Sequence, residues 1–350
     1  MMAKHSHSNT AQPRWRATLG ALAVIGAALL AAPPARAIDV VRFGAAAMGM
    51  PQGPVMMAVV APEVFAKHGI ELKITDFRGS ATNTIVAQIA NNVDVTSNGA
   101  GFVMDAIAEG ADLKALSLTV GPMTDVYLSA QTVAKLGVKL NDPLERRLKA
   151  LQGLRIGSNG GSSSSHFLNL NELFKKFGMA QDSVRLAPIS DVQGMMASIR
   201  NNQIDGGMWS TGGLSGLSAD KSGIRWISIA RENAIETTDI PYSAMWASSQ
   251  WLEKNPDLSR RLAAAFAEAA RLLKSDKSKY SKLIKDKYFP DMSQAIWDDT
   301  YEESLPAYVD DGRLTKAGWD KLIQQRVGVT KKDYSRATFE RSVVDFAWRR

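Results

Sequence analysis

The sequence predicts an α/β protein made of two similar lobes, in which strands alternate with helices around a mostly parallel sheet. Three pairs of matching segments indicate this: 42–44 with 155–157, 63–70 with 172–179, and 87–92 with 197–202, the last pair followed by Asp94 and Asp205. The pairs occur in the same order along the chain, at offsets of 113, 109 and 110 residues. Three matches at nearly constant offset predict a duplicated strand–loop–helix–strand–helix–strand unit, with a period too long for a solenoid.

Residues 1–37 have the features of a secretory signal peptide. Basic residues precede an apolar run at 19–32, which is 14 residues long and therefore short for a membrane span. An Ala-Arg-Ala cleavage signal follows at 35–37. We therefore expect export to the periplasm and removal of the leader.

The charge balance and the rare residue types exclude several classes of function. The chain holds 42 basic and 35 acidic residues, and four basic but no acidic residues lie within 1–37. The remaining 38 basic and 35 acidic residues form no basic stripe interleaved with aromatic residues, so nucleic-acid binding is not expected. The absence of cysteine excludes disulfides, thiol catalysis and a lipidated anchor. No apolar run after the leader approaches membrane-spanning length, so the mature chain should not be membrane-embedded. Only His68 and His166 lie outside the leader, so we expect neither a metal site nor a cofactor.

The first lobe is expected to open with a strand at 40–44, followed by a loop rich in Gly, Ala and Met. A helix follows at 55–68 and ends at Gly69. The other elements expected in this lobe are a strand at 72–77, a helix at 81–91, a strand at 93–95, a helix at 102–109 and a strand at 113–120.

The second lobe follows a charged insertion at 135–152, whose 144–151 portion we expect to be a solvated helix. The elements expected in it are a strand from 154, helices at 167–177 and 191–201, and strands at 184–187, 206–209 and 224–229. A returning strand at 241–246 precedes a helical tail, with helices at 251–274, 280–288, 292–308, 316–325 and 338–348. The tail is too long for a third copy and should pack on the first lobe. That lobe is then discontinuous, comprising 38–125 and 240–350, with 126–239 as the second lobe.

The stretch at 154–166 combines the features of a ligand-binding loop. Gly160 and Gly161 let the backbone approach a ligand, and four serines follow directly before a helix begins. Such a helix start attracts an anion or a polar acceptor, although a flexible serine-rich loop with an ordinary cap is the alternative. Ligands bind beyond the carboxyl ends of the strands in open α/β sheets. Two facing lobes would therefore bring their loops to one cleft that closes by hinge motion.

The order of several segments resembles a known family across 40–326. The segments are 65–72, 87–94, 151–157, 162–167, 197–205, 241–245 and 311–318. They resemble the periplasmic substrate-binding proteins of ABC importers, in the nitrate, taurine and alkanesulfonate branch (SsuA/TauA-like, NMT1/THI5-like). The resemblance implies a type II periplasmic binding fold, with two hinge connections and a ligand between the lobes. It also implies delivery of the ligand to a membrane permease and its ATPase.

The resemblance further implies ligand contacts from the loops that follow the strands. The candidate ligand-binding residues are Gln52, Ser80, Asn83, Asn98, Gly99, Ser158, Ser162, Ser163, Asp191 and Trp209. Some have structural alternatives: the serines and Asp191 as helix caps, Asn98 as a turn former, and Trp209 as packing between lobes. Arg78 could bind an oxyanion or form a surface ion pair, and His166 could cap a helix or contact the ligand.

We therefore expect a monomeric periplasmic receptor for a small organic solute, anionic or amide-like, of the sulfonate, nitrate or carboxylate type. Two alternatives stay open: a neutral aromatic or pyrimidine-type solute, and a solute-binding partner of a sensor. An enzyme resembling pyrimidine synthase is less favoured, because the sequence shows no residues for its cofactor or metal. In addition, residues 157–161 do not form a G-x-S-x-G elbow, and no acid partner is placed for His166.

Overall fold

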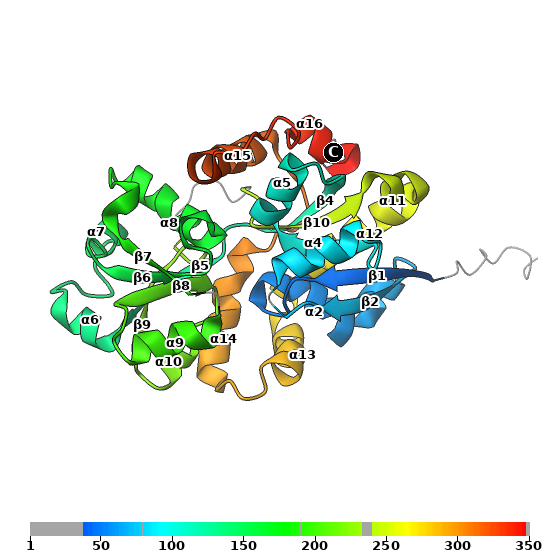
Figure 1. The fold of residues 1–350 in the computed structure, drawn as a ribbon. Helices are drawn as coiled ribbons and strands as arrows, with labels where there is room; N and C mark the ends of the chain where they lie inside the picture. Colours follow the sequence, from blue (N-terminus) through cyan, green and yellow to red (C-terminus); the bar gives the residue numbers. More distant parts are fainter. Residues whose placement is uncertain (1–37, 79, 190, 233–239, 348–350) are drawn as a thin grey trace, which may run out of the picture. The chain divides into compact units, whose positions relative to one another are not determined.

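Two five-stranded sheets form the framework of the described residues, which in this computed structural model are 38–78, 80–189, 191–232 and 240–347 (Figure 1). The expected signal peptide lies outside these residues. The strand order is β2-β1-β3-β10-β4 in the first sheet and β7-β6-β8-β5-β9 in the second. In each sheet the fourth strand, β10 or β5, runs antiparallel to both neighbours, and the other pairings are parallel.

The strands lie close to the predicted positions, with two exceptions. Those of the first sheet are β1 (Asp39–Ala45), β2 (Ile70–Asp76), β3 (Val95–Gly99), β4 (Leu113–Val120) and β10 (Ser243–Ser248). Those of the second sheet are β5 (Thr124–Ser129), β6 (Arg155–Ser158), β7 (Arg185–Pro188), β8 (Gly206–Ser210) and β9 (Gly223–Ser228). The strand predicted at 93–95 begins only at Val95, and β5 was not predicted.

The misplacement of β3 has a physical cause. The polar residues of β3 are typical of a loop, but the structure buries them and provides hydrogen-bond partners from α4 and β10. The Thr96 hydroxyl donates to Gln88 Oε1 at 2.8 Å, and Ser97 Oγ lies 3.4 Å from Ser243 Oγ. Because these partners come from other elements, alternation of apolar and polar residues does not reveal the strand.

The shared strand order supports the predicted duplication, and matching residues have matching roles. The backbone N–H of Arg42 donates to the Asp94 carboxylate at 2.9 Å, and that of Arg155 donates to Asp205 at 2.7 Å. In return the backbone N–H of each aspartate donates to the carbonyl of its arginine. Each aspartate thus fixes the turn that precedes β3 or β8 to the neighbouring strand.

The helices of the first half are η1 (Met50–Gln52), α2 (Gly53–Val60), α3 (Pro62–Ala66), α4 (Ala81–Ile89) and α5 (Ala100–Ala108). The single helix predicted at 55–68 is wrong: α2 and α3 meet at Ala61, where Pro62 supplies no N–H donor to continue the hydrogen-bond ladder. The helix predicted at 102–109 begins at Ala100 instead.

The helices of the second half are α6 (Ala130–Lys135), α7 (Leu144–Lys149), η2 (Gly161–Ser163), α8 (Ser165–Lys176), η3 (Gln181–Ser183), α9 (Val192–Arg200) and α10 (Gly216–Ala219). The expectation of a solvated helix at 144–151 is only partly right, since Arg147 and Leu148 are buried. The guanidinium of Arg147 donates to the Trp226 carbonyl at 2.6 Å and pairs with Glu232.

The tail contains α11 (Ser249–Lys254), α12 (Pro256–Ser275), α13 (Lys277–Tyr288), α14 (Gln294–Ser304), η4 (Leu305–Ala307), α15 (Lys316–Thr330), α16 (Phe339–Ser342) and η5 (Asp345–Ala347). The helix predicted at 251–274 is interrupted at Pro256. The one predicted at 338–348 is only partly right within its described part, because the α-helix α16 ends at Ser342 and Val343 forms a bridge to Ala115 of β4.

The tail packs on the first sheet and also contacts the second. Helix α12 lies against α2, α3 and β4. Arg326 of α15 pairs with Asp105 of α5, and Tyr334 donates to the same carboxylate at 2.5 Å. Lys321 of α15 lies 3.7 Å from Glu172 of α8, in the second half. We call the first sheet with its helices and the tail the first lobe, and the second sheet with its helices the second lobe. The residue bounds of the lobes stay a prediction.

None of the helices in the described segments is both long and apolar enough to cross a bilayer.

Candidate functional site

A cavity of about 240 Å³ lies between the two lobes and is lined by loops from both. Its lining includes the residues that end or follow four strands: Ala46 after β1, Asn98 and Gly99 of β3, Asn159 after β6, and Thr211 after β8. The predicted position at the carboxyl ends of the parallel strands is therefore where the cavity occurs. Tyr242 and Ser243, at the start of β10, complete the wall where the chain returns to the first sheet.

Four of the predicted ligand-binding residues line this cavity, namely Gln52, Asn98, Gly99 and Trp209. The lining identified in the described part of the chain does not include Ser80, Asn83, Ser158, Ser162 or Asp191. The side chain of Ser163 lies outside what the structure describes. The ligand contacts of all ten stay a prediction.

Several of these side chains cap helices or shape a loop, which is the structural alternative to ligand binding. Ser80 caps α4 by accepting from the Asn83 N–H at 3.2 Å, and Asp191 caps α9 by accepting from Gly194 at 2.7 Å. The Ser158 hydroxyl lies 2.8 Å from that of Ser164, the residue that caps α8. Part of the serine-rich sequence therefore shapes the loop at the cavity edge.

The side-chain amide of Asn98 also forms hydrogen bonds within the protein. Its amide nitrogen donates to the Ala81 carbonyl at 3.0 Å, and its oxygen accepts from the Gly99 N–H at 2.8 Å. These bonds join the end of β3 to the start of α4. Arg78 and His68 lie elsewhere: Arg78 is exposed, and His68 is 2.7 Å from Glu268.

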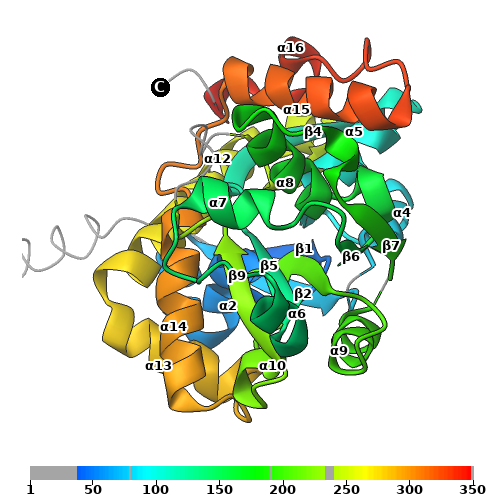
Figure 2. The ribbon, with the colours of Figure 1, turned by 90° about the vertical axis from the view of Figure 1, so that its left-hand side faces the viewer.

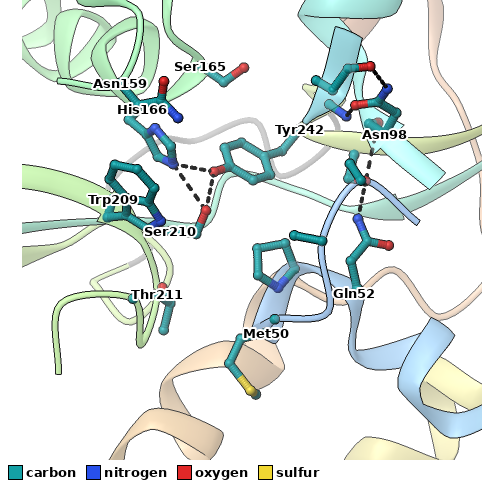
Figure 3. A pocket seen from close by; sticks show the side chains of 18 of the residues that line it. Met50, Gln52, Asn98, Asn159, Ser165, His166, Trp209, Ser210, Thr211 and Tyr242 are labelled. Carbon is teal, nitrogen blue, oxygen red and sulfur yellow. Dashed lines mark hydrogen bonds between the residues drawn. The ribbon is translucent and has the colours of Figure 1, made fainter. Parts of the chain in front are cut away.

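A cluster of three hydrogen-bonding side chains at the cavity wall was not predicted (Figure 3). The Tyr242 hydroxyl lies 2.8 Å from His166 Nε2 and 2.8 Å from Ser210 Oγ, and Ser210 Oγ lies 3.0 Å from His166 Nε2. The sequence offered His166 as a candidate without partners, because Ser210 and Tyr242 are 44 and 76 residues away along the chain. No local pattern could have joined them.

Aromatic rings form one side of the cavity. Trp209 and His166 are stacked, with ring centroids 5.8 Å apart and an angle of 21° between planes. Tyr242 meets His166 edge-on at 6.0 Å, and Phe102 and Phe289 also line the space. Burial lowers the pKa of His166 to about 4, so the imidazole is neutral at pH 7. This wall is therefore flat, aromatic and uncharged.

In the described residues, no Asp, Glu, Lys or Arg side chain lines the cavity. Polar contacts come instead from amides, hydroxyls and helix starts. The helices α2 and α5 begin at the cavity, with Gln52 and Gly99 as N-caps, and no side chain caps either of them. In α2 the Gly53 N–H donates to the Met50 carbonyl and Pro54 has no N–H, so the start of α5 is the better donor. Uncapped N–H groups at a helix start favour an oxygen acceptor, whether a carbonyl or an anionic group. Among the same residues, no cluster of His, Asp and Glu is arranged to hold a metal ion.

The family model described as NMT1/THI5 like matches residues 55–277, more than half of the chain. The chain belongs to the NMT1/THI5 like family. The resemblance stated from the sequence is thereby confirmed. No curated protein sequence is significantly similar to this family member.

Solved structures similar to this NMT1/THI5 like protein confirm the fold class. The periplasmic aliphatic sulphonate binding protein SsuA from Escherichia coli has a TM-score of 0.66 at 14% identity, covering 88% of this chain and 94% of its own. The alkanesulfonate-binding protein SsuA from Xanthomonas axonopodis pv. citri, bound to MOPS, has a TM-score of 0.64 at 16% identity, covering 88% and 99%. The periplasmic nitrate-binding protein NrtA from Synechocystis PCC 6803 has a TM-score of 0.64 at 13% identity, covering 89% and 88%. The fold is the type II periplasmic binding fold, with two lobes and two connections.

Proposed function

We propose that this protein is the periplasmic solute-binding component of an ABC importer and encloses a small organic solute between its lobes. The observation that carries the proposal is the cavity itself, which is lined by strand-end loops of both lobes. A solute bound there contacts both lobes only when they are close together, so its binding energy favours closure. Family membership and the sulphonate- and nitrate-binding names of similar structures support the same role.

The site supports binding better than catalysis. His166 Nε2 is within hydrogen-bond distance of Ser210, but His166 Nδ1 is buried without a hydrogen-bond partner among the described residues. A base that activates a serine is normally oriented by a second group on its other nitrogen. His166 lacks that orientation, and its low pKa makes it a poor proton acceptor at pH 7.

The lining also indicates the kind of solute. The stacked Trp209 and His166 rings suit a flat aromatic or heteroaromatic body, and the uncapped start of α5 suits one carbonyl, carboxylate or sulfonate group. No charged side chain of the described residues is available for a small ion such as nitrate. We therefore favour an aromatic acid, with a neutral heteroaromatic amide as the second candidate.

A matched solute panel tests this proposal. The mature chain from Ile38 is titrated in a calorimeter with benzoate, benzenesulfonate, methanesulfonate, nitrate, nicotinamide and uracil. We expect binding by at least one ring-containing member, and weaker binding by methanesulfonate, which shares the sulfonate of benzenesulfonate but lacks its ring. Tight binding of nitrate or methanesulfonate alone would overturn the aromatic assignment. No binding in this panel and in a broad solute library would overturn the receptor role.

The importer partners require a cellular test. We propose that the closed protein docks transiently on a permease that is driven by an ATPase, and that the protein itself is monomeric. Deletion of its gene should abolish uptake of the radiolabelled solute without loss of the permease. Uptake that persists while a transcriptional response to the solute disappears would instead support the sensor alternative.

A further inference from the structure

Helix α14 lies between the two sheets (Figure 1) and beside α13 of the tail (Figure 2), and its two faces contact different lobes. Trp297 and Tyr301 are buried in the apolar core that also contains residues of β1 and α12, and the Tyr301 hydroxyl donates to the Leu273 carbonyl at 2.8 Å. The other face carries Asp299 and Glu303, which both pair with Arg225 of the second lobe. The helix is thus anchored on the first lobe and held by charge to the second.

The contact between α14 and the second lobe is a cluster of ion pairs. Arg225 of β9 pairs with Glu303 and, at 2.7 Å, with Asp299, while Arg231 also pairs with Asp299. The Glu303 side chain is fully buried, and 16% of the Arg225 side chain is exposed. A buried pair that spans two lobes depends strongly on their separation, because a solvated charge gains little from its partner. We call Arg225, Arg231, Asp299, Glu303 and the neighbouring Asp125 the interlobe cluster.

Asp125 connects this cluster to the cavity. It lies on β5 and is 1% exposed. One carboxyl oxygen accepts from the Thr211 hydroxyl at 3.1 Å, and the other lies 3.4 Å from the Gly212 N–H, and both of these residues line the cavity. The loop that touches the solute site and the charges that join the lobes therefore meet at one carboxyl group.

The charges of the interlobe cluster favour a bound proton. The cluster holds three carboxyl groups, of Asp125, Asp299 and Glu303, against two guanidinium groups, of Arg225 and Arg231. Ionisation of all three carboxyl groups would therefore leave one unbalanced charge at a site where Asp125 and Glu303 are buried. Burial, followed by the charge of Glu303, raises the pKa of Asp125 to about 8, and burial also raises the pKa of Glu303. The titratable and charged groups that act on or are affected by Asp125 are Arg225, Glu303, Tyr127 and Tyr242.

We propose that the interlobe cluster stabilises the closed arrangement of the lobes, and that closure takes up one proton at Asp125. The inference rests on the proposed function, in which closure encloses a solute. Opening carries Glu303 away with α14 and lets water reach Asp125, which then ionises as an ordinary carboxyl group. Between the ordinary value near 4 and the closed-state value, the ratio of closed to open protein falls by up to about tenfold per pH unit as pH rises.

The absence of cysteine allows a direct measurement of lobe separation. Cysteines replace Thr82 and Gln193, which are exposed and stand at equivalent positions in the first turns of α4 and α9. Spin labels on this pair report the interlobe distance by pulsed electron paramagnetic resonance, without solute, from pH 5.5 to pH 9. We expect the short-distance fraction to fall as pH rises. In Asp125→Asn, which mimics the protonated carboxyl, it should stay constant.

The charge contribution is tested with matched variants of α14. Glu303→Gln should lower the short-distance fraction at every pH. Asp298→Asn, an exposed neighbour on the same helix that bonds to Gln294, removes the same charge and should change nothing. Asp299→Asn, at a partly exposed site, should give a smaller decrease in the short-distance fraction. This variant replaces Glu303→Gln in the test if circular dichroism shows that Glu303→Gln does not fold.

A pH-independent distance in the parent protein, a pH response that persists in Asp125→Asn, or identical behaviour of the α14 variants would each overturn the proposal. The measurement needs no solute, so its failure is separate from failure of the solute panel. A pH response without any solute binding would leave the interlobe cluster established and remove the receptor role.

Discussion

Replacing Gly212 by alanine should destabilise the protein for two separable reasons. Gly212 has φ of +82°, a left-handed conformation in which an L side chain costs about 1–2 kcal/mol. A Cβ at this position would also lie 2.6 Å from Cγ2 of Thr300 on α14. Thr300 is fully buried and β-branched, so its methyl group cannot easily move away. Overpacking of this kind costs about 1–3 kcal/mol in addition.

A matched glycine separates the two contributions. Gly153 has φ of +76°, and a Cβ there would meet nothing within 4 Å. Gly153→Ala should therefore lower the free energy of unfolding by about 1–2 kcal/mol, while Gly212→Ala should lower it by about 2–5 kcal/mol. The effect of alanine on the unfolded chain is common to both variants and cancels in the comparison.

Urea unfolding at 25 °C, followed by circular dichroism, measures these differences. Thr300→Ser removes the methyl group, so in a double-mutant cycle it should recover most of the additional loss in Gly212→Ala. Equal destabilisation by the Gly153 and Gly212 substitutions would refute the reasoning. So would a Gly212 variant that Thr300→Ser does not rescue, because either result would mean that the loop after β8 and α14 are not in contact.

Three further predictions concern the site and the tail. Trp209→Ala should weaken binding of a ring-containing solute about tenfold, or about 1.4 kcal/mol, in calorimetry, and an unchanged affinity would remove this ring from the site. Because the pKa of His166 is lowered to about 4, its neutral form stabilises the fold above pH 6.5, and this contribution is lost as pH falls toward 4. Urea unfolding should therefore show the parent losing up to about 3 kcal/mol relative to His166→Gln between pH 7 and pH 4, whereas parallel curves would contradict the assignment. Asp105→Ala removes a carboxylate that pairs with the buried Arg326 and should cost about 3 kcal/mol in the same assay, against less than about 1 kcal/mol for the exposed Glu109→Ala.

The sequence predicted most of the elements whose signals are local. The duplicated unit was visible because the paired turns need the same residues, as Arg42 with Asp94 and Arg155 with Asp205 show. Apolar periodicity located α8 and α9 to within a few residues. It did not reveal the break at Pro62, and it misplaced β3, whose polar residues are satisfied only by partners in other elements.

The sequence predicted the position of the cavity better than the residues that line it. Gln52, Asn98, Gly99 and Trp209 line the cavity because loops after parallel strands converge at one edge of a sheet. Ser80 and Asp191 carry the same local signature, a polar residue before a helix, but their side chains cap the helix backbone. A cap and a ligand contact look alike in sequence, since both need a short polar side chain at a helix start.

By itself the sequence determined a repeated α/β architecture, the expected edge for ligand binding, and a chain without thiol or histidine-rich chemistry. Those properties depend on residue type and on neighbours a few positions apart. The tertiary structure alone decided that Tyr242 reaches His166 and Ser210, and that α14 places Glu303 against Arg225. The physical reason is distance along the chain: contacts between residues tens of positions apart arise only when sheets and helices pack, and they leave no periodic pattern to read.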